Sequence, residues 1–154
     1  MAYDDGNIFA KILRGEIPCK KVAEDEHTLA FEDINPLRAV HVLVIPKGAY
    51  VDWRDFAATA SADEQAAFTR MIAHVADITG IAGSGYRVIS NIGQDGGQEV
   101  PHLHMHVLGG EPVGPLVARG CPSAHLIISE NLILLRGNRH TDLMDDPAGQ
   151  GSAP

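Results

Sequence analysis

Alternating apolar and polar side chains predict several short strands along the chain. Branched and aromatic residues bounded by polar turns favour strands over residues 20–24, 28–33 and 41–45. Residues 85–91 and 102–108 alternate with a period of two, which directs successive side chains to opposite faces of a strand. The pattern therefore predicts five short strands separated by turns and helices.

Two other stretches have the spacing of helices. Asn7 is a suitable N-cap for a short helix over residues 8–13, and residues 1–6 ahead of it are expected to be a loose acidic lead. A longer helix is expected to begin at Ser61, with Glu64 completing a capping box. The apolar residues of this longer helix recur every three or four positions and form one core-facing stripe, namely Phe68, Met71, Ile72, Val75 and Ile78.

The most unusual stretch is HLHMHVLGG over residues 102–110. Three of the eight histidines in the chain, His102, His104 and His106, occupy alternate positions with apolar residues between them. On a strand these three imidazoles share one face, and the apolar residues face the core. The first interpretation of this row is a hydrated polar face of a sheet that has no catalytic or ligand-binding role.

A metal site is a second interpretation of the row, because imidazole is a common zinc ligand. At about 3.3 Å per residue, the Cα atoms of His102 and His106 lie about 13 Å apart. Zinc requires each ligand nitrogen at about 2.0–2.1 Å, so one straight strand can direct two rings at a metal but hardly three. The sequence has no Cys-x-x-Cys and no His-Glu-x-x-His pattern to supply further ligands. We therefore expect neither a metal nor another cofactor, although a two-histidine metal site stays open.

Nucleophilic catalysis by an imidazole is the third interpretation. One neutral histidine attacks, while flanking histidines stabilise negative charge or transfer protons. Mutual repulsion prevents three close imidazoles from all being protonated, so we expect a mixture of neutral and cationic rings near pH 7. Only His104 has an imidazole neighbour on both sides, each about 6.7 Å away between Cα atoms, and this favours the middle ring as the nucleophile.

Composition narrows the range of functions. The chain has 154 residues, of which 45% are hydrophobic and 21% charged, as in an ordinary globular domain. The 12 basic and 20 acidic residues give a net charge of −8, which argues against binding of duplex nucleic acid. No apolar run approaches the ~20 residues of a membrane span, and residues 1–5 lack a signal-peptide core. Cys19 and Cys121 are expected to be free thiols, so we predict a cytoplasmic protein with no membrane or nucleic-acid partner.

The row of histidines also resembles a known signature. The pattern His-φ-His-φ-His-φ-φ, with φ apolar, is similar to that of the histidine triad (HIT) nucleotide-binding proteins, and Val-Leu-Gly-Gly at residues 107–110 resembles their Hint branch. The resemblance spans residues 7–118 and includes NIFAKI, LAFEDI, HVLVIPK, GYRV and GGQ. Several dispersed motifs in the expected order make this resemblance specific.

The resemblance implies an α+β fold, the HIT fold, with a five-stranded antiparallel sheet, one short helix and one long helix. It also implies a homodimer in which the two sheets join into a continuous sheet of ten strands. Residues 1–118 would form the HIT domain and residues 119–154 a C-terminal extension. The last stretch, residues 145–154, is rich in Gly, Pro, Ala and Ser, and we expect it to be disordered.

The same resemblance implies roles for individual residues. His104 would be the nucleophile, and His102 would align the triad or relay protons. His106 and Asn91 would hold the phosphate oxygens, and His41 would be a fourth imidazole near the phosphate. The residues implied to bind the nucleotide are Ile8, Phe9, Ile12, Asp33, Ile34, Asn91, Gly97, Gln98 and Val100.

Some of these positions have a second explanation in the sequence alone. The apolar residues of the first helix would form a wall of the nucleobase pocket, but core packing explains them too. Asp33 would accept hydrogen bonds from the ribose hydroxyls, although a carboxylate there can also cap the turn before Pro36. Amides of the glycine-rich loop at residues 92–98 would come close to the phosphate, because glycine permits close approach of the backbone.

The implied activity is hydrolysis of the phosphorus–nitrogen bond in a purine nucleoside 5′-phosphoramidate, an AMP or GMP derivative, through a nucleotidyl-histidine on His104. One alternative is a dinucleoside polyphosphate hydrolase or nucleotidyltransferase of the HIT fold, although the apolar residues after His106 argue against a transferase. Another is a nucleotide- or partner-binding module with little turnover. Glu99 stands where many relatives have serine, and we expect it to point outward or to face a cationic leaving group.

Overall fold

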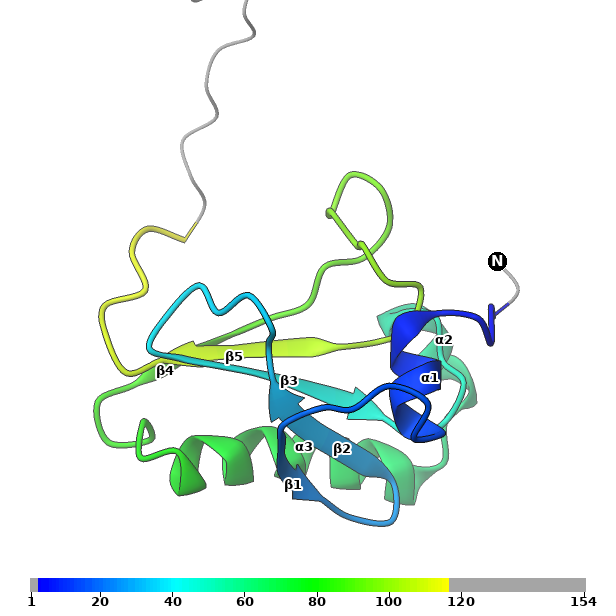
Figure 1. Ribbon diagram of the computed structural model, residues 1–154, viewed down its shortest axis with the longest axis horizontal. Coiled ribbons are helices and arrows are strands. Elements are labelled where there is room, and N and C mark those ends of the chain that lie inside the picture. Colours follow the sequence, from blue (N-terminus) through cyan, green and yellow to red (C-terminus); the bar gives the residue numbers. More distant parts are fainter. Residues whose placement is uncertain (1–2, 117–154) are drawn as a thin grey trace, which may run out of the picture. The chain divides into compact units, whose positions relative to one another are not determined.

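The computed structural model describes residues 3–116, which form an antiparallel sheet with helices on both faces (Figure 1). The helices are α1 (Ile8–Leu13), α2 (Trp53–Thr59) and α3 (Ala62–Ile78). The strands are β1 (Lys21–Glu24), β2 (Thr28–Glu32), β3 (Val40–Pro46), β4 (Tyr86–Ile89) and β5 (Met105–Gly109). The predicted α+β class is confirmed, and each predicted helix and strand has a counterpart.

The sheet has five strands in the order β1-β2-β3-β5-β4, and all neighbouring strands run antiparallel. The first three strands follow one another in sequence, whereas β5 inserts between β3 and β4. This insertion makes β3 and β5 central strands and leaves β1 and β4 at the edges of the sheet. The predicted five-stranded antiparallel sheet is confirmed.

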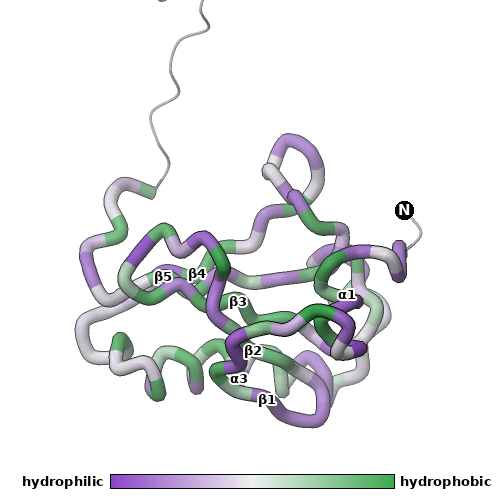
Figure 2. The backbone as a smooth tube through the Cα atoms, viewed as in Figure 1, coloured by the Kyte–Doolittle hydropathy of each residue, from purple (hydrophilic) through white to green (hydrophobic). Residues whose placement is uncertain are grey.

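Alternation of side chains along β3 gives the sheet two different faces. Val42 and Val44 are buried in the cluster that includes α3, while Leu43 and Ile45 are buried in a second cluster with Phe9 of α1. Full burial of one such aliphatic side chain stabilises the fold by about 1.5–3 kcal/mol. The period-two pattern in the sequence therefore separates an α3 face from an α1 face of the same sheet. Figure 2 shows the hydrophobic residues along β3.

The register of the central strands fixes the orientation of the histidine row. His106 lies opposite Leu43, and Val107 lies opposite Val42. Residues directly opposite in an antiparallel pair project to the same face. His106 therefore lies on the α1 face beside Leu43, and Val107 joins the core under α3.

Both predicted helix starts are confirmed. The side-chain oxygen of Asn7 accepts hydrogen bonds from the amides of Phe9 and Ala10, each 2.9 Å long. Ser61 and Glu64 form the predicted capping box at the start of α3. A side-chain cap of this kind contributes about 1 kcal/mol, so these local signals fix where the helices begin.

The strand that carries the histidines is shorter than the sequence predicts. It begins at Met105, so residues 102–104 lie outside the ladder. Pro101 has no amide to donate, and the His102 amide donates to the Val100 carbonyl (2.8 Å), which bends the chain before the strand. The prediction of one regular strand over residues 102–108 is therefore wrong for its first three residues.

Within residues 3–116, no helix combines the length and apolar character needed to span a bilayer. Cys19 is a half-buried free thiol, as predicted, while Cys121 lies outside the described residues. The predicted extension at residues 119–154, with the expected disorder at its end, also lies outside the described part of the chain.

Candidate active site

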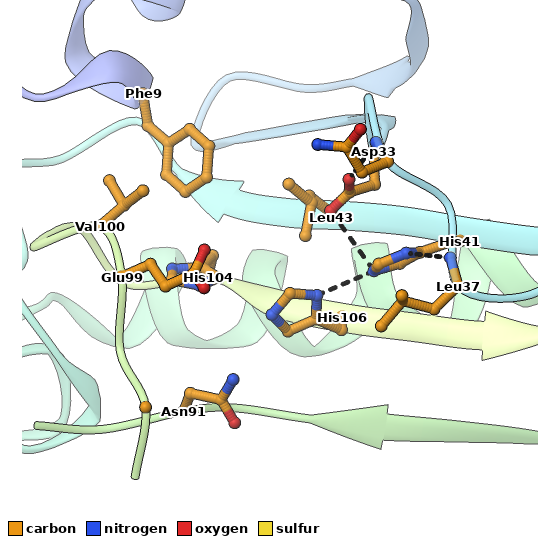
Figure 3. A pocket seen from close by; sticks show the side chains of 12 residues that line it. Phe9, Asp33, Leu37, His41, Leu43, Asn91, Glu99, Val100, His104 and His106 are labelled. Atoms are coloured by element: carbon orange, nitrogen blue, oxygen red, sulfur yellow. Dashed lines mark hydrogen bonds and ion pairs between the residues drawn. The ribbon is translucent and has the colours of Figure 1, made fainter. Parts of the chain in front are cut away.

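A cavity of about 380 Å³ opens on the α1 face of the sheet, over the central strands (Figure 3). A volume of this order suits a small organic ligand. The lining side chains come from α1, the turn after β2, the central strands, the end of β4 and the glycine-rich loop. The lining residues are Phe9, Asp33, Asn35, Leu37, His41, Leu43, Asn91, Gly97, Glu99, Val100, His104 and His106.

The cavity has an apolar wall and a row of hydrogen-bonding groups. In Figure 3, Phe9, Leu43 and Val100 lie on one side of the pair His104 and His106, and Asn91 lies on the other side. The ring of Phe9 meets His104 edge-on, with ring centroids 5.2 Å apart. One ligand could therefore place a flat apolar group against the wall and a polar group beside the histidines.

His41 and His106 form a directed hydrogen-bond chain on the polar side. The amide of Leu37 donates to Nδ1 of His41 (3.1 Å), so the proton of a neutral His41 ring resides on Nε2. That Nε2–H donates to Nδ1 of His106 (2.9 Å). A neutral His106 consequently carries its proton on Nε2 and can donate it to a ligand oxygen. This tautomer assignment follows from the hydrogen-bond partners.

His104 has the opposite arrangement. Its Nδ1 lies 2.7 Å from the backbone carbonyl of His102, which can only accept, so Nδ1 carries the proton. The remaining nitrogen, Nε2, keeps its lone pair, and no hydrogen bond from the described residues occupies it. The ring is buried, with 5% of its surface exposed, and lines the cavity. His104 therefore has the tautomer that a nucleophilic imidazole requires.

His102 does not line the cavity. It is completely buried, and its Nε2 donates to the carbonyl of Pro46 (2.9 Å). Its Nδ1 is hydrogen-bonded to the hydroxyl of Tyr3. Both ring nitrogens are thus engaged by structural partners, which favours the aligning role predicted for His102 over the relay of protons.

Burial keeps the histidines of this cluster neutral. Desolvation lowers the pKa of His102 to about 4 and that of His106 to about 4, with nearby imidazoles contributing to both shifts. Desolvation also lowers the pKa of His104 and of His41, and the Asp33 carboxylate opposes it in both cases. The predicted mixture of neutral and cationic rings near pH 7 is wrong, because desolvation outweighs the favourable charges around these rings.

Asp33, His41 and His106 form a cluster of side chains that are common metal ligands. One ligand atom from each of Asp33, His41 and His106 lies within 4.8 Å of the other two. A metal would need the lone pair of His41 Nε2, but the Leu37 amide directed at Nδ1 keeps the His41 proton on Nε2. These residues therefore fit a hydrogen-bond relay better than a metal site.

The glycine-rich loop shapes one wall of the cavity. Gly97 lines it with a φ of 71°, a conformation that L side chains rarely adopt. The amides of Gly97 and Gln98 donate within the loop, to the carbonyls of Gln94 and Gly93 (both 3.0 Å). Those two amides therefore do not face the cavity as free donors, which differs from the expectation of phosphate contacts from the loop backbone.

The structure brings most of the predicted site residues together. Those that line the cavity are His41, His104, His106, Phe9, Asp33, Asn91, Gly97 and Val100.

The other predicted residues lie elsewhere. Ile8 and Ile34 are 47% and 91% exposed, and Ile12 packs against the apolar cluster under α1. The Gln98 side chain donates to the carbonyls of Val51 (2.7 Å) and Val100 (3.1 Å), so it ties the loop to the body of the protein.

Several lining residues were not among the predicted site residues. Leu43 had a signal, since it lies two residues after His41 on one strand and therefore shares its face. Asn35 and Leu37 lie in an irregular turn, where no periodicity indicates the direction of a side chain. Glu99 is exposed and also lines the cavity near His104.

The described residues form a five-stranded antiparallel sheet that presents His41, His104 and His106 in one cavity, as the resemblance to the histidine triad proteins implies. The HIT domain profile matches residues 14–113. The chain is 46% identical over 114 residues to the purine nucleoside phosphoramidase of Escherichia coli K12, covering 72% of this chain and 92% of that protein. The chain belongs to the HIT domain family.

Other relatives agree with this assignment. An uncharacterised 13.2 kDa HIT-like protein of Azospirillum brasilense is 58% identical over 118 residues, which cover 77% of this chain and 97% of that protein. The structure of a HIT family hydrolase from Clostridium thermocellum matches with a TM-score of 0.69 and 38% identity, over 75% of this chain and 99% of that one. The HIT fold is thus supported by both sequence and structure.

Proposed function

We propose that this protein hydrolyses the phosphorus–nitrogen bond of purine nucleoside 5′-phosphoramidates and releases a nucleoside monophosphate and an amine. The observation that carries the proposal is the tautomer of His104, whose Nδ1–H is held by a backbone carbonyl while Nε2 remains free at the cavity. The name of the E. coli relative, purine nucleoside phosphoramidase, supports the same reaction.

The cavity accommodates the parts of such a substrate in order. The base would lie against Phe9, Leu43 and Val100, which form the apolar wall. The ribose hydroxyls would donate to Asp33, whose Oδ1 already accepts from the Asn35 amide (2.8 Å) and whose Oδ2 lies 3.5 Å from Nε2 of His41. The turn-capping and ribose-binding interpretations of Asp33 are therefore compatible, because the two oxygens serve different partners.

The first chemical step forms a covalent bond to His104. Its Nε2 lone pair attacks phosphorus, the bond from phosphorus to the leaving nitrogen breaks, and that nitrogen takes the electron pair and a proton from the solvent. The positive charge that develops on the ring is stabilised by the His102 carbonyl at Nδ1. The Nε2–H of His106 and the amide of Asn91 would donate to the phosphate oxygens.

Water completes the reaction. It attacks the phosphorus of the nucleotidyl-histidine and gives up one proton to the solvent, while the bond to Nε2 of His104 breaks with return of the lone pair to the ring. The sum of both steps consumes one water and yields one nucleoside monophosphate and one amine. A neutral nucleophile is required throughout, and the lowered pKa of His104 keeps its ring neutral near pH 7.

Glu99 favours an amine over a phosphate as the leaving group. Its carboxylate lines the same cavity as His104. A dinucleoside polyphosphate would place further negative phosphates beside this carboxylate, whereas an amine adds no negative charge. This observation favours phosphoramidate hydrolysis over the hydrolysis of dinucleoside polyphosphates.

We also propose a homodimer joined through β4. This strand is last in the strand order of the sheet, and β5 is its only neighbour among the described strands. Tyr86 and Val88 on this strand are each 39% exposed. A second copy paired there would protect the edge and produce a continuous ten-stranded sheet.

The test of the proposed activity is AMP release from adenosine 5′-phosphoramidate in the presence of a chelator. We expect the native chain to release AMP and the H104A variant to lose this activity by about a thousandfold or more. His74→Ala is the matched control, because His74 is exposed on α3 and does not line the cavity. No release by the native chain, with AMP still bound, would instead leave a nucleotide-binding module.

A further inference from the structure

The N-terminal segment reaches the buried side of the histidine cluster. Tyr3 and His102 are separated by 99 positions in the sequence, yet the Tyr3 hydroxyl is hydrogen-bonded to Nδ1 of His102. The two rings meet edge-on, with centroids 5.5 Å apart and planes inclined at 65°. The expected loose lead at residues 1–6 is therefore wrong for Tyr3, which is partly buried and has a specific partner.

The direction of this hydrogen bond follows from the other nitrogen of the ring. The Pro46 carbonyl can only accept, so Nε2 of His102 carries a proton. His102 is completely buried and neutral near pH 7, so its Nδ1 has a lone pair. The hydroxyl of Tyr3 must then be the donor, and burial raises the pKa of Tyr3 so that the hydroxyl keeps its proton.

Tyr3 is presented by contacts at the start of α1. The Asn7 side chain caps that helix through Oδ1 and donates through Nδ2 to the Asp4 carbonyl (2.7 Å). The Asn7 amide donates to the same carbonyl (3.2 Å). These bonds fix the backbone directly after Tyr3, so its ring is held by an ordered turn.

His102 in turn determines the position of a carbonyl that the nucleophile uses. The segment ahead of Met105 has no ladder hydrogen bonds, so the sheet does not position it. Backbone anchors of this segment are Leu103 N–H to the Tyr50 carbonyl (2.7 Å) and the Ser90 hydroxyl to the His104 carbonyl (3.2 Å), and the Leu103 side chain is buried in the core. The His102 side chain adds a further anchor between Tyr3 and Pro46. The His102 carbonyl held in this way accepts from Nδ1 of His104.

We propose that Tyr3 is a positioning residue for the nucleophile. Its hydroxyl fixes the ring of His102, the fixed ring holds the His102 carbonyl, and that carbonyl keeps His104 protonated on Nδ1 with Nε2 free. The proposal rests on the proposed nucleophilic role of His104. Tyr3 itself lies outside the cavity lining and acts only through the two histidines.

The test is the Tyr3→Phe variant, which keeps the aromatic ring and removes the hydroxyl. A buried Nδ1 left without its donor destabilises the native arrangement of His102, so its tautomers should mix. We expect kcat for adenosine phosphoramidate to fall about tenfold with an unchanged KM, because ground-state binding does not involve Tyr3. In ¹⁵N spectra of the imidazoles at pH 7, the native chain should show Nε2–H for His102 and Nδ1–H for His104. The variant should lose the single tautomer at His102.

Tyr50→Phe is the matched control. Its hydroxyl donates to Glu64 (2.8 Å), away from the cavity, and its ring packs edge-on against Phe56. We expect native kcat and native imidazole spectra for this variant. Native kcat and native imidazole spectra for Tyr3→Phe would overturn the proposal. This holds even if the variant has a lower thermal midpoint, because the Tyr3 hydroxyl would then contribute to stability but not to the position of His104. If the native chain has no turnover, the proposed function fails. The proposed positioning by Tyr3 is then still tested by the imidazole spectra, which show whether the tautomers of His102 and His104 change in Tyr3→Phe.

Discussion

Replacing His102 by Gln should make the stability of the protein less sensitive to acid. His102 is completely buried between the Tyr3 hydroxyl and the Pro46 carbonyl, and burial lowers its pKa to about 4. In the unfolded chain the same imidazole has an ordinary pKa of about 6.5. Glutamine offers one donor and one acceptor to the same partners but does not titrate in this range.

The sign and size of the effect follow from proton linkage. Between about pH 6.5 and pH 4 the unfolded chain binds a proton at His102 that the folded chain excludes, so folding weakens as pH falls. Each pH unit in this window corresponds to about 1.36 kcal/mol, so the loss reaches about 2 kcal/mol at pH 5 and about 3 kcal/mol at pH 4. Below the folded pKa both states are protonated, and the contribution no longer changes.

Urea denaturation at pH 7, 6 and 5 measures this contribution. The free energy of unfolding of the native chain, minus that of His102→Gln, should fall by about 2 kcal/mol between pH 7 and pH 5. Titration of carboxylates affects both proteins equally and cancels in the difference. A difference that stays constant across this range would refute the idea that buried, neutral His102 is a source of acid sensitivity.

Three further changes test separate parts of the site and assembly. Asp33→Asn should raise KM about tenfold for adenosine phosphoramidate but little for its 2′,3′-dideoxy analogue, since only the first can donate to the carboxylate; equal effects on both substrates would exclude ribose binding by Asp33. Glu99→Gln should raise kcat/KM for diadenosine tetraphosphate relative to the phosphoramidate by about tenfold, because the repelling charge is removed, and an unchanged ratio would contradict its role in leaving-group selection. Val88→Arg should halve the mass measured by light scattering, because the substitution places a charge at the proposed β4 interface. Ala57→Arg, on the exposed side of α2, should leave the mass unchanged. A native mass for Val88→Arg would place any dimer interface elsewhere.

Much of the fold was predictable because its signals are local. The cap at Asn7, the capping box at Ser61 and the alternation of β3 each depend on neighbours within a few residues. Part of the site followed from the same signals, since His41 and His106 lie on regular strands whose alternation fixes their faces. The additional lining residue Leu43 could have been derived from this alternation.

The remainder of the site depends on contacts between distant segments. His102 follows the period of its neighbours in sequence, but Pro101 and the bend at Val100 remove it from the strand, and its ring is turned to Tyr3 and Pro46. Periodicity carries no information about such irregular backbone. The protonation states likewise depend on burial, which only the packed structure defines.

The most direct test of the account is the identity of the atom that attacks phosphorus. The native chain can be mixed with adenosine phosphoramidate, stopped at alkaline pH to preserve a phosphorus–nitrogen bond, digested and analysed by mass spectrometry. We expect an adenylyl group on the peptide that contains residues 102–106, assigned by fragmentation to His104, and its absence in His104→Ala. Turnover in the native chain without any adduct, or an adduct on His106, would contradict nucleophilic attack by His104.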